Sequence, residues 1–257
     1  MIELKGITKK YGDFRAVDNL NLTVVRGGIF GFLGPNGGGK TTTIKMMSGV
    51  LKPSAGSVTI GGIDMLKQPE AAKRKIGFIP DRPYLYEKLT GMEFLKFTAD
   101  LYGVPDAMYR KKAQKNLEMF SLADWSDELI ESYSHGMKQR LIMSAALLHD
   151  PEIIIVDEPM VGLDPAAIIM VKELFQRLAR TGVSVFMSTH TLAIAADTCD
   201  RVGIIHRGRL IASGTTADLQ NEANVTDADL EKVVRATAAT GYANAGQVCI
   251  STQRVLV

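Results

Sequence analysis

The sequence has little cysteine and almost no net charge. Its 257 residues include two cysteines, Cys199 and Cys249, which lack the paired spacing of a metal site. A disulfide framework is therefore not indicated, and we expect a reducing compartment. The formal net charge is +2, which is too close to balance to indicate a nucleic-acid partner.

Long apolar runs are also missing. No stretch approaches the ~20 apolar residues that a membrane-spanning helix needs, and the mixed polarity of residues 1–5 does not predict a signal peptide. If the protein works at a membrane, we expect it to do so through a partner. The hydrophobic fraction of 46% is ordinary for a globular protein and allows a sizeable core.

One glycine-rich stretch is the strongest signal that is present. An apolar run at 29–33 predicts a buried strand, and residues 44–47 predict the start of a helix. Between them lie Gly34, Pro35, Asn36, Gly37, Gly38, Gly39, Lys40, Thr41 and Thr42. This is the strand, loop and helix context of the phosphate-binding Walker A motif, G-x-x-x-x-G-K-[ST]. A plain glycine turn is the alternative interpretation.

The chemistry of this motif follows from its residue types. Backbone N–H groups of the glycine loop and the positive end of the helix can surround phosphates. Lys40 can reach the β- and γ-phosphates, and the Thr41 hydroxyl can ligate Mg²⁺. The loop alone therefore predicts that phosphates bind, as they would in a kinase, a GTPase or a motor.

The rest of the chain alternates between strand and helix patterns, which predicts an α/β fold with a mainly parallel central sheet. Strands are expected at 2–5, 20–25, 57–60, 76–79, 152–156, 183–188, 202–206 and 210–213, the first two of them antiparallel with Tyr11 in a polar turn between them. The helix after the glycine loop is expected to run to about Leu51. Residues 84–150 hold almost no strand pattern and predict a helical insertion, with a capping box at Thr90 and Glu93.

Acidic residues and a histidine follow two of the predicted strands. Asp157 and Glu158 end the strand at 152–156, and His190 follows the strand at 183–188. Ligand sites in open α/β sheets lie beyond the carboxyl ends of strands. Asp157 is placed to hold Mg²⁺, Glu158 to act as a base or orient an attacking water, and His190 to reach the γ-phosphate. A solvated loop and a structural histidine are the alternatives.

Taken together and in this order, the motifs over about residues 1–224 resemble those of the ATP-binding subunits of ABC transporters. Residues 153–158 resemble Walker B with its glutamate, 162–165 the D-loop with Asp164, and 188–190 the H-loop. Residues 133–140 occupy the signature position, and Tyr11 is similar to the aromatic A-loop residue that stacks on adenine. The resemblance implies a P-loop ATPase domain with an N-terminal antiparallel β subdomain, a helical subdomain at about 84–150, and ATP and Mg²⁺ as cofactors.

The resemblance also implies partners. In this family two copies, identical or different, sandwich two ATP molecules head to tail, so Ser134 and Gly136 would face the ATP on the partner's Walker A. Transmembrane permease subunits would hold the protein peripherally at the cytoplasmic face of the membrane, with a groove for them near Asp81 to Tyr86. No nucleic-acid partner is expected. The signature sequence resembles the variant of bacterial exporters, which favours export.

Three motifs depart from the family pattern: the signature, the D-loop and the Q-loop. His135 and Met137 replace a glycine and a glutamine in the signature, and Val161 precedes the D-loop where serine is common. Asp81 occupies the position of the Q-loop glutamine. Its carboxylate can still contact Mg²⁺, and we include it among the candidate metal ligands, but it adds negative charge near the γ-phosphate.

A second resemblance covers the last residues of the chain. Residues 227–257 resemble the segment around the catalytic cysteine of aldehyde dehydrogenases, in which Cys249 would be the nucleophile and Asn244 an oxyanion-hole donor. A nucleophile without its base and cofactor domain does not make an enzyme, so we expect no dehydrogenase activity. We interpret 225–257 as a recombined gene end rather than as a divergent helix and strand.

The alternative function class is a soluble ABC-type ATPase. Some ABC-type ATPases act on ribosomes or in DNA repair without a transporter. They usually carry two ATPase cassettes or a long coiled-coil insertion, whereas this sequence has one Walker A motif, no heptad run and no strong basic patch. Transport is therefore the favoured hypothesis, and the transported substrate is not predicted.

Overall fold

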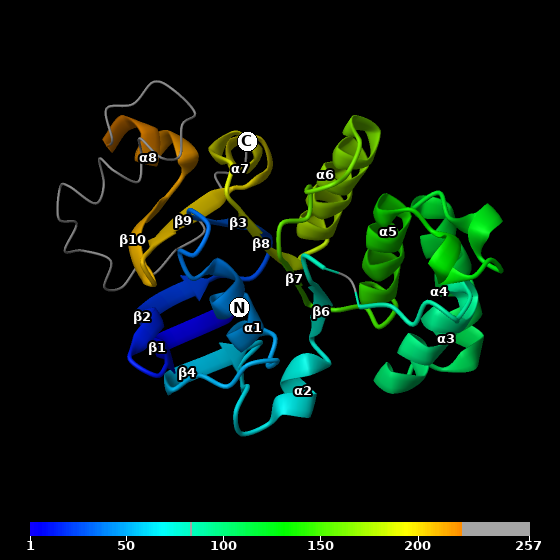
Figure 1. Cartoon of the computed structure of the whole chain (residues 1–257), viewed down its shortest axis with the longest axis horizontal. Helices are drawn as coiled ribbons and strands as arrows, with labels where there is room; N and C mark the ends of the chain where they lie inside the picture. The colour runs from blue at the N-terminus through cyan, green and yellow to red at the C-terminus, as the bar shows by residue number, and fades with distance from the viewer. Residues whose placement is uncertain (83, 223–257) are drawn as a thin grey trace.

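A six-stranded sheet forms the centre of the molecule, with strand order β10-β9-β3-β8-β7-β6. A computed structural model describes residues 1–82 and 84–222 of the chain (Figure 1). The strands are β3 (Gly28–Leu33), β6 (Ile76–Ile79), β7 (Ile153–Val156), β8 (Ser184–Thr189), β9 (Arg201–His206) and β10 (Arg209–Gly214). All neighbours pair in parallel except β10, which runs antiparallel to β9. The predicted α/β fold with a mainly parallel sheet is confirmed.

A second, antiparallel sheet is built by the N-terminal part of the chain. Its order is β2-β1-β4-β5, with β1 (Ile2–Tyr11), β2 (Phe14–Val24), β4 (Ala55–Ile60) and β5 (Ile63–Asp64). The placement of Tyr11 in a turn was wrong, because Tyr11 is the last residue of β1 and pairs with Phe14. Register shifts within the β1–β2 ladder interrupt the alternation of apolar residues, so the sequence pattern made both strands look too short.

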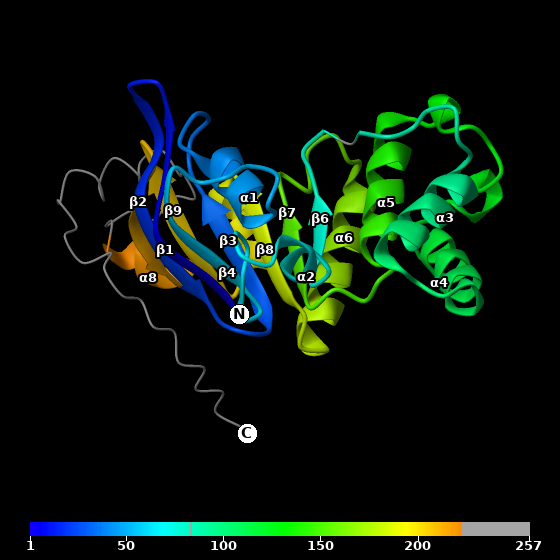
Figure 2. The same cartoon turned by 90° about the horizontal axis from the view of Figure 1, so that it is seen from below.

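Helix α1 (Lys40–Met47) lies between the two sheets and contacts β2 and β4. Its residues Met46 and Met47 share an apolar core with Phe186 of the central sheet. The helix is shorter than the predicted extension to Leu51. The helix ends at Met47 because Gly49, two residues later, adopts a left-handed conformation with φ of 69°, and this conformation terminates helices. Figure 2 shows α1 enclosed between the antiparallel strands and the central sheet.

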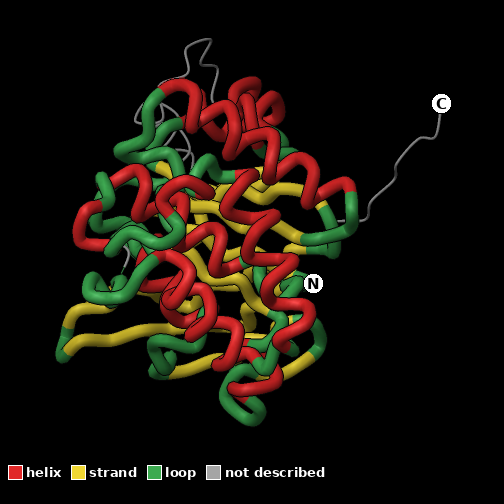
Figure 3. The backbone as a smooth tube through the Cα atoms, turned by 90° about the vertical axis from the view of Figure 1, so that its right-hand side faces the viewer, coloured by secondary structure: helices red, strands yellow, loops and turns green. Residues whose placement is uncertain are grey.

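Other helices cover the central sheet. Helix α6 (Pro165–Arg180) contacts β3 and β8, and α7 (Leu192–Thr198) also contacts both strands. Two further short helices, α2 (Pro69–Lys73) and α8 (Thr216–Glu222), lie beside β6 and β10, respectively. Figure 3 shows the helices in front of the strands when the molecule is viewed from the side.

The stretch between β6 and β7 is helical, as predicted. It contains α3 (Gly91–Tyr102), α4 (Asp106–Met119) and α5 (His135–Ala146), with short 3₁₀ turns at Ala123–Trp125 and Ile130–Ser132. The capping box of Thr90 and Glu93 is formed at the start of α3. These helices pack together at one end of the molecule, and α5 contacts β6 (Figures 1 and 2). Among the described residues, no helix is long and apolar enough to cross a membrane.

Candidate active site

The glycine loop joins β3 to α1 at one edge of the central sheet. Gly39 has a φ of 110° and directly precedes the first helical residue, Lys40. The loop is also pressed against its neighbours, since a Cβ atom on Gly34 would lie 2.3 Å from the carbonyl oxygen of Ile205. The Gly38 carbonyl accepts a hydrogen bond from the Gly208 N–H at 2.9 Å. Glycine is therefore required here for both conformation and space.

Lys40 extends from the first turn of α1 back into the loop. Its side chain is 6% exposed, and its Nζ atom donates to the Gly34 carbonyl at 2.7 Å and to the Pro35 carbonyl at 3.4 Å. The same Nζ lies 3.6 Å from Oε1 of Glu158. The ammonium group is thus held at the centre of the loop, beside a carboxylate from another strand.

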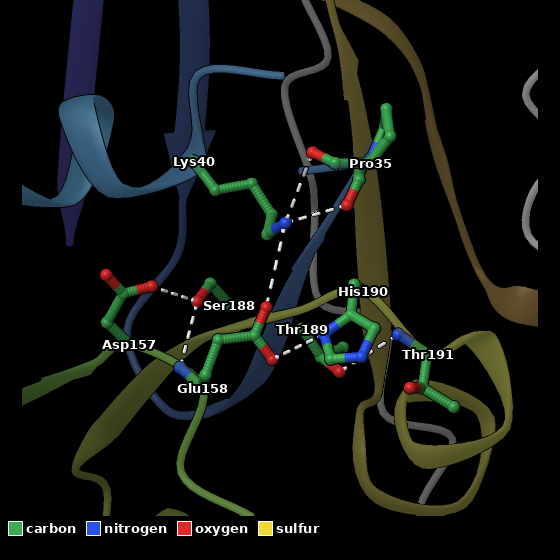
Figure 4. A network of polar contacts seen from close by, with 9 residues as sticks. Pro35, Lys40, Asp157, Glu158, Ser188, Thr189, His190 and Thr191 are labelled. Atoms are coloured by element: carbon green, nitrogen blue, oxygen red, sulfur yellow. Dashed lines mark hydrogen bonds and ion pairs between the residues drawn. The ribbon is translucent and has the colours of Figure 1, made fainter. Parts of the chain in front are cut away.

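Glu158 connects Lys40 to His190. Its Oε2 lies 3.1 Å from Nδ1 of His190 (Figure 4). The Glu158 backbone has a φ of 50°, an uncommon conformation for a residue that is not glycine. The tertiary structure therefore brings together the three residues that the sequence predicted to be catalytic: Lys40 at the start of α1, Glu158 after β7 and His190 after β8.

Asp157, the predicted Mg²⁺ ligand, is 3% exposed. Its Oδ1 accepts a hydrogen bond from the Ser188 hydroxyl at 2.5 Å, and the Ser188 Oγ in turn accepts from the Glu158 N–H at 3.0 Å. Sequence reasoning noted Ser188 only as part of the H-loop and missed this bridge. The available signal was a small polar residue that directly follows the apolar run Val185–Met187 of the same strand.

The remaining predicted residues lie outside this cluster. Within residues 1–82 and 84–222, no hydrogen bond or ion pair joins Lys40, Glu158 or His190 to the side chains of Tyr11, Asp81, Ser134 or Asp164. Tyr11 is 52% exposed, with the Lys9 ammonium 5.4 Å above its ring. Asp81 is exposed in the bend that follows β6, and Thr41 is exposed beside Lys40 on α1.

Ser134 and Asp164 each begin a helix. The Ser134 hydroxyl accepts from the Met137 N–H at 3.3 Å at the start of α5, and Asp164 accepts from the Ala167 N–H at 2.9 Å at the start of α6. Both residues are exposed. The two helix starts lie close together, since a Cβ atom on Gly162 would lie 2.9 Å from the His135 ring. This surface can therefore be reached by another molecule.

No preformed cage for a metal ion is visible in the described part of the chain, where no group of three or more His, Cys, Asp or Glu residues could hold one. Asp157 and Thr41 offer one carboxylate and one hydroxyl. Oxygen ligands of this kind are those that Mg²⁺ prefers, usually together with water and substrate phosphates.

Cys199, the only cysteine among the described residues, makes no hydrogen bond or ion pair with Lys40, Glu158 or His190. Cys199 is partly buried, with its sulfur beside Gly31 of β3, and burial raises the pKa of its thiol to about 12, so its reactive thiolate form is suppressed. Cys249 and Asn244, the residues of the second resemblance, lie outside the described residues. Among the described residues, the candidate reactive groups are therefore those of the glycine loop and of the residues that follow β7 and β8.

Comparison with protein families agrees with this geometry. The family model described as "ABC transporter" matches residues 17–161. A model described as "Aldehyde dehydrogenase family" matches residues 221–257, which repeats the second resemblance of the sequence.

Several named proteins are similar to most of this chain. The linearmycin resistance ATP-binding protein LnrL of Bacillus subtilis is 40% identical over 219 residues, covering 85% of this chain and 70% of the relative. The daunorubicin/doxorubicin resistance ATP-binding protein DrrA of Streptomyces peucetius is 37% identical, with coverage of 86% and 67%. The probable multidrug ABC transporter ATP-binding protein YbhF of Escherichia coli is 39% identical, and the match covers 86% of this chain and 38% of that longer protein.

Solved structures share the fold. The ATP-binding subunit of an ABC transporter superposes with a TM-score of 0.85 at 33% identity, covering 93% of this chain and 99% of the other. A dimeric ATP-binding cassette in a post-hydrolysis state, bound to ADP and Pi, superposes with a TM-score of 0.78 at 27% identity, covering 84% and 99%.

Proposed function

The chain belongs to the ABC transporter family of ATP-binding proteins and is an ABC-type ATP hydrolase, and we propose that it powers a membrane exporter. The observation that carries the proposal is the convergence of Lys40, Glu158 and His190 at the ends of three strands. The direction of transport is inferred from relatives named for resistance to antibiotics. Such resistance is consistent with moving a compound out of the cell.

In the proposed mechanism, the γ-phosphate of ATP lies over the glycine loop, where Lys40 stabilises its charge. Glu158 orients the attacking water and accepts its proton. His190, held by Glu158 at 3.1 Å, supports the charge that develops on the γ-phosphate in the transition state. Tyr11 stacks on the adenine ring, which its exposed position at the end of β1 allows.

Mg²⁺ is proposed as the metal cofactor. The oriented carboxylate of Asp157 and the hydroxyl of Thr41 would hold it, and their oxygen atoms fit its ligand preference. Asp81 is proposed as a further, more distant ligand from the end of β6. When bound, Mg²⁺ neutralises charge on the β- and γ-phosphate oxygens.

Two copies are proposed to share each ATP. The exposed N-terminus of α5, with Ser134 and Gly136, would bind the γ-phosphate held by the partner's glycine loop, because free N–H groups at a helix start attract anions. Asp164 would lie at the same interface. The dimeric state of the ADP-bound structural relative supports this arrangement.

Transmembrane permease subunits are the proposed second partner, which would hold the chain at the cytoplasmic face of the membrane. The proposed contact lies beside α3, where Tyr84 is 89% exposed and Tyr86 packs edge-on against Phe97 at 5.3 Å between ring centroids. Exposed aromatic residues are common in protein interfaces. We also propose 1–224 as the ATPase domain, 84–150 as its helical part, and 225–257 as a separate tail.

Co-purification tests the transport role. The tagged chain is expressed in its own host, extracted in mild detergent, and its retained partners are identified by mass spectrometry. A multi-span membrane protein that raises the ATPase rate when reconstituted in vesicles is the expected result. Retention of ribosomes or nucleic acid, with no membrane protein, would contradict transport.

A further inference from the structure

Ser188 holds together the two acidic residues of the site. It lies near the end of β8, and its side chain is completely buried, with 0% exposure. Its hydroxyl donates to Asp157 Oδ1 at 2.5 Å and accepts from the Glu158 N–H at 3.0 Å. A single hydroxyl group therefore contacts the side chain of one acid and the backbone of the next (Figure 4).

The register of the sheet explains this geometry. Strands β7 and β8 are parallel neighbours, with Val156 opposite Met187. The next residues, Asp157 directly after β7 and Ser188 on β8, then follow at the same level. Side chains alternate along a strand, so these two residues point to the face that carries Ile155 and Phe186, which share the core next to α1. Asp157 and Ser188 are therefore directed toward the glycine loop and its helix.

The contact with the Glu158 backbone has a second effect. Glu158 has a φ of 50°, and such left-handed backbone in a residue with a side chain persists only when its surroundings hold it. The hydrogen bond from its N–H to Ser188 is one such constraint. The carboxylate of Glu158 leaves this backbone toward Lys40 and His190, so the position of the backbone sets the position of the catalytic group.

We propose that Ser188 is a positioning residue for ATP hydrolysis. It fixes the orientation of the Asp157 carboxylate, so that its other oxygen is available to Mg²⁺, and it holds the Glu158 backbone that directs the carboxylate toward the attacking water. The inference rests on the roles proposed above for Asp157 and Glu158. Hydrogen-bond partners of metal ligands typically change metal affinity or activity by about 10- to 100-fold.

The test compares S188A and S188T with S184A as a matched control. Ser184 lies on the same strand, is equally buried at the opposite end, and its hydroxyl accepts from the Gly27 N–H at 2.9 Å. Each full-length variant is assayed for kcat, for binding of a fluorescent ADP without metal, and for the Mg²⁺ concentration that gives half-maximal hydrolysis. Melting temperatures are recorded in parallel.

We expect S188A to lower kcat about 10- to 100-fold and to raise the Mg²⁺ requirement, with metal-free ADP binding unchanged within twofold. S188T keeps the hydroxyl and should recover most of kcat, and S184A should leave kcat within twofold of the wild type. A kcat of S188A within twofold of the wild type, an equal loss in S184A, or no recovery in S188T would each overturn the inference.

Two further measurements keep the outcome clear. If S188A does not fold, S188C replaces it, because a thiol is of similar shape but is a weak hydrogen-bond donor. A kcat of S188C equal to that of the wild type would then overturn the inference.

The E158Q variant separates this proposal from the proposed function. Undiminished turnover in E158Q contradicts the hydrolysis mechanism itself, whereas undiminished turnover in S188A contradicts only the role of Ser188.

Discussion

Lys40 and Glu158 form an ion pair, with 3.6 Å between Nζ and Oε1, although the two strands that they follow are not neighbours in the sheet. Lys40 follows β3 and Glu158 follows β7, and β8 lies between these strands in the sheet. Ser188 and His190, at the end of β8, occupy the intervening position and both contact Glu158. The pair therefore marks the centre of a site to which three strand ends contribute, and the predictions below test its parts.

Replacing Glu158 by glutamine should keep ATP binding and block turnover. Glutamine preserves size and hydrogen-bonding oxygen but cannot accept a proton from water, so we expect kcat to fall at least about 100-fold. Steady-state phosphate release and binding of a fluorescent ATP analogue measure the two properties. E152Q is the control, because Glu152 directly precedes β7, at the end of the strand opposite to Glu158, and forms an ion pair with Lys75. Unchanged phosphate release in E158Q would contradict the assignment.

Replacing Lys40 by alanine should weaken nucleotide binding itself. The loss of a charged hydrogen bond to phosphate costs about 1.5–3 kcal/mol, which corresponds to a roughly 10- to 100-fold increase in Kd. Titration of the purified variant with nucleotide measures this change. K45A is the control, since Lys45 lies exposed on the same helix. Equal Kd values for K40A and K45A would exclude Lys40 as a phosphate ligand.

Replacing Ser134 by aspartate should prevent ATP-dependent dimerisation. Aspartate still caps a helix start, so α5 should remain folded, but its charge repels the γ-phosphate on the partner. In the E158Q background, light scattering after gel filtration should show a dimer with ATP, and S134D should remain a monomer under the same conditions. S132D, at an exposed serine two residues earlier, should still dimerise. A dimer of S134D would argue against the shared site.

Replacing Asp81 by asparagine tests its proposed contact with Mg²⁺. Removal of one ligand charge should raise the Mg²⁺ concentration for half-maximal hydrolysis about 3- to 10-fold, equivalent to roughly 1 kcal/mol. The D124N variant removes an exposed carboxylate from the helical region and should have the wild-type requirement. If D81N and the wild type need the same Mg²⁺ concentration for half-maximal hydrolysis, Asp81 is not a metal ligand.

His149 should make stability depend on pH. Its ring stacks on that of Tyr102, with 3.8 Å between the ring centroids, and its Nε2 lies 3.0 Å from the Ile76 carbonyl oxygen. Burial lowers the pKa of His149 below the ordinary 6.5. The backbone hydrogen bond and Asp150 oppose this shift, and Lys112 adds to it.

The sign of the effect follows from linkage. As pH falls below 6.5, the unfolded chain binds a proton at His149 that the folded chain does not, so stability decreases between the ordinary pKa and the lowered one. The melting temperature of the wild type should therefore fall more steeply between about pH 7 and 5.5 than that of H149Q. H135Q, at an exposed histidine, should follow the wild type. If the melting temperatures of the wild type and of H149Q fall equally steeply over this pH range, the prediction is wrong.

Much of the fold could be predicted because its signals are local. Apolar runs marked the buried strands, and the capping box marked the start of α3, which is formed as expected. The errors arose where tertiary structure overrides the pattern. Bulges interrupt the alternation in β1 and β2, which displaced Tyr11 from its predicted turn, and Gly49 ends α1 earlier than its apolar residues suggest.

The sequence by itself determined which chemical groups the site contains. The glycine loop with Lys40 and Thr41, the acidic pair of Asp157 and Glu158, and His190 could be read from residue types and spacing, because each motif lies within a few consecutive residues. Only the tertiary structure decided how they meet. The order β3-β8-β7 and the register of Val156 with Met187 place Ser188 between Asp157 and Glu158. Strand order and register depend on how the whole core packs, and no local pattern contains that information.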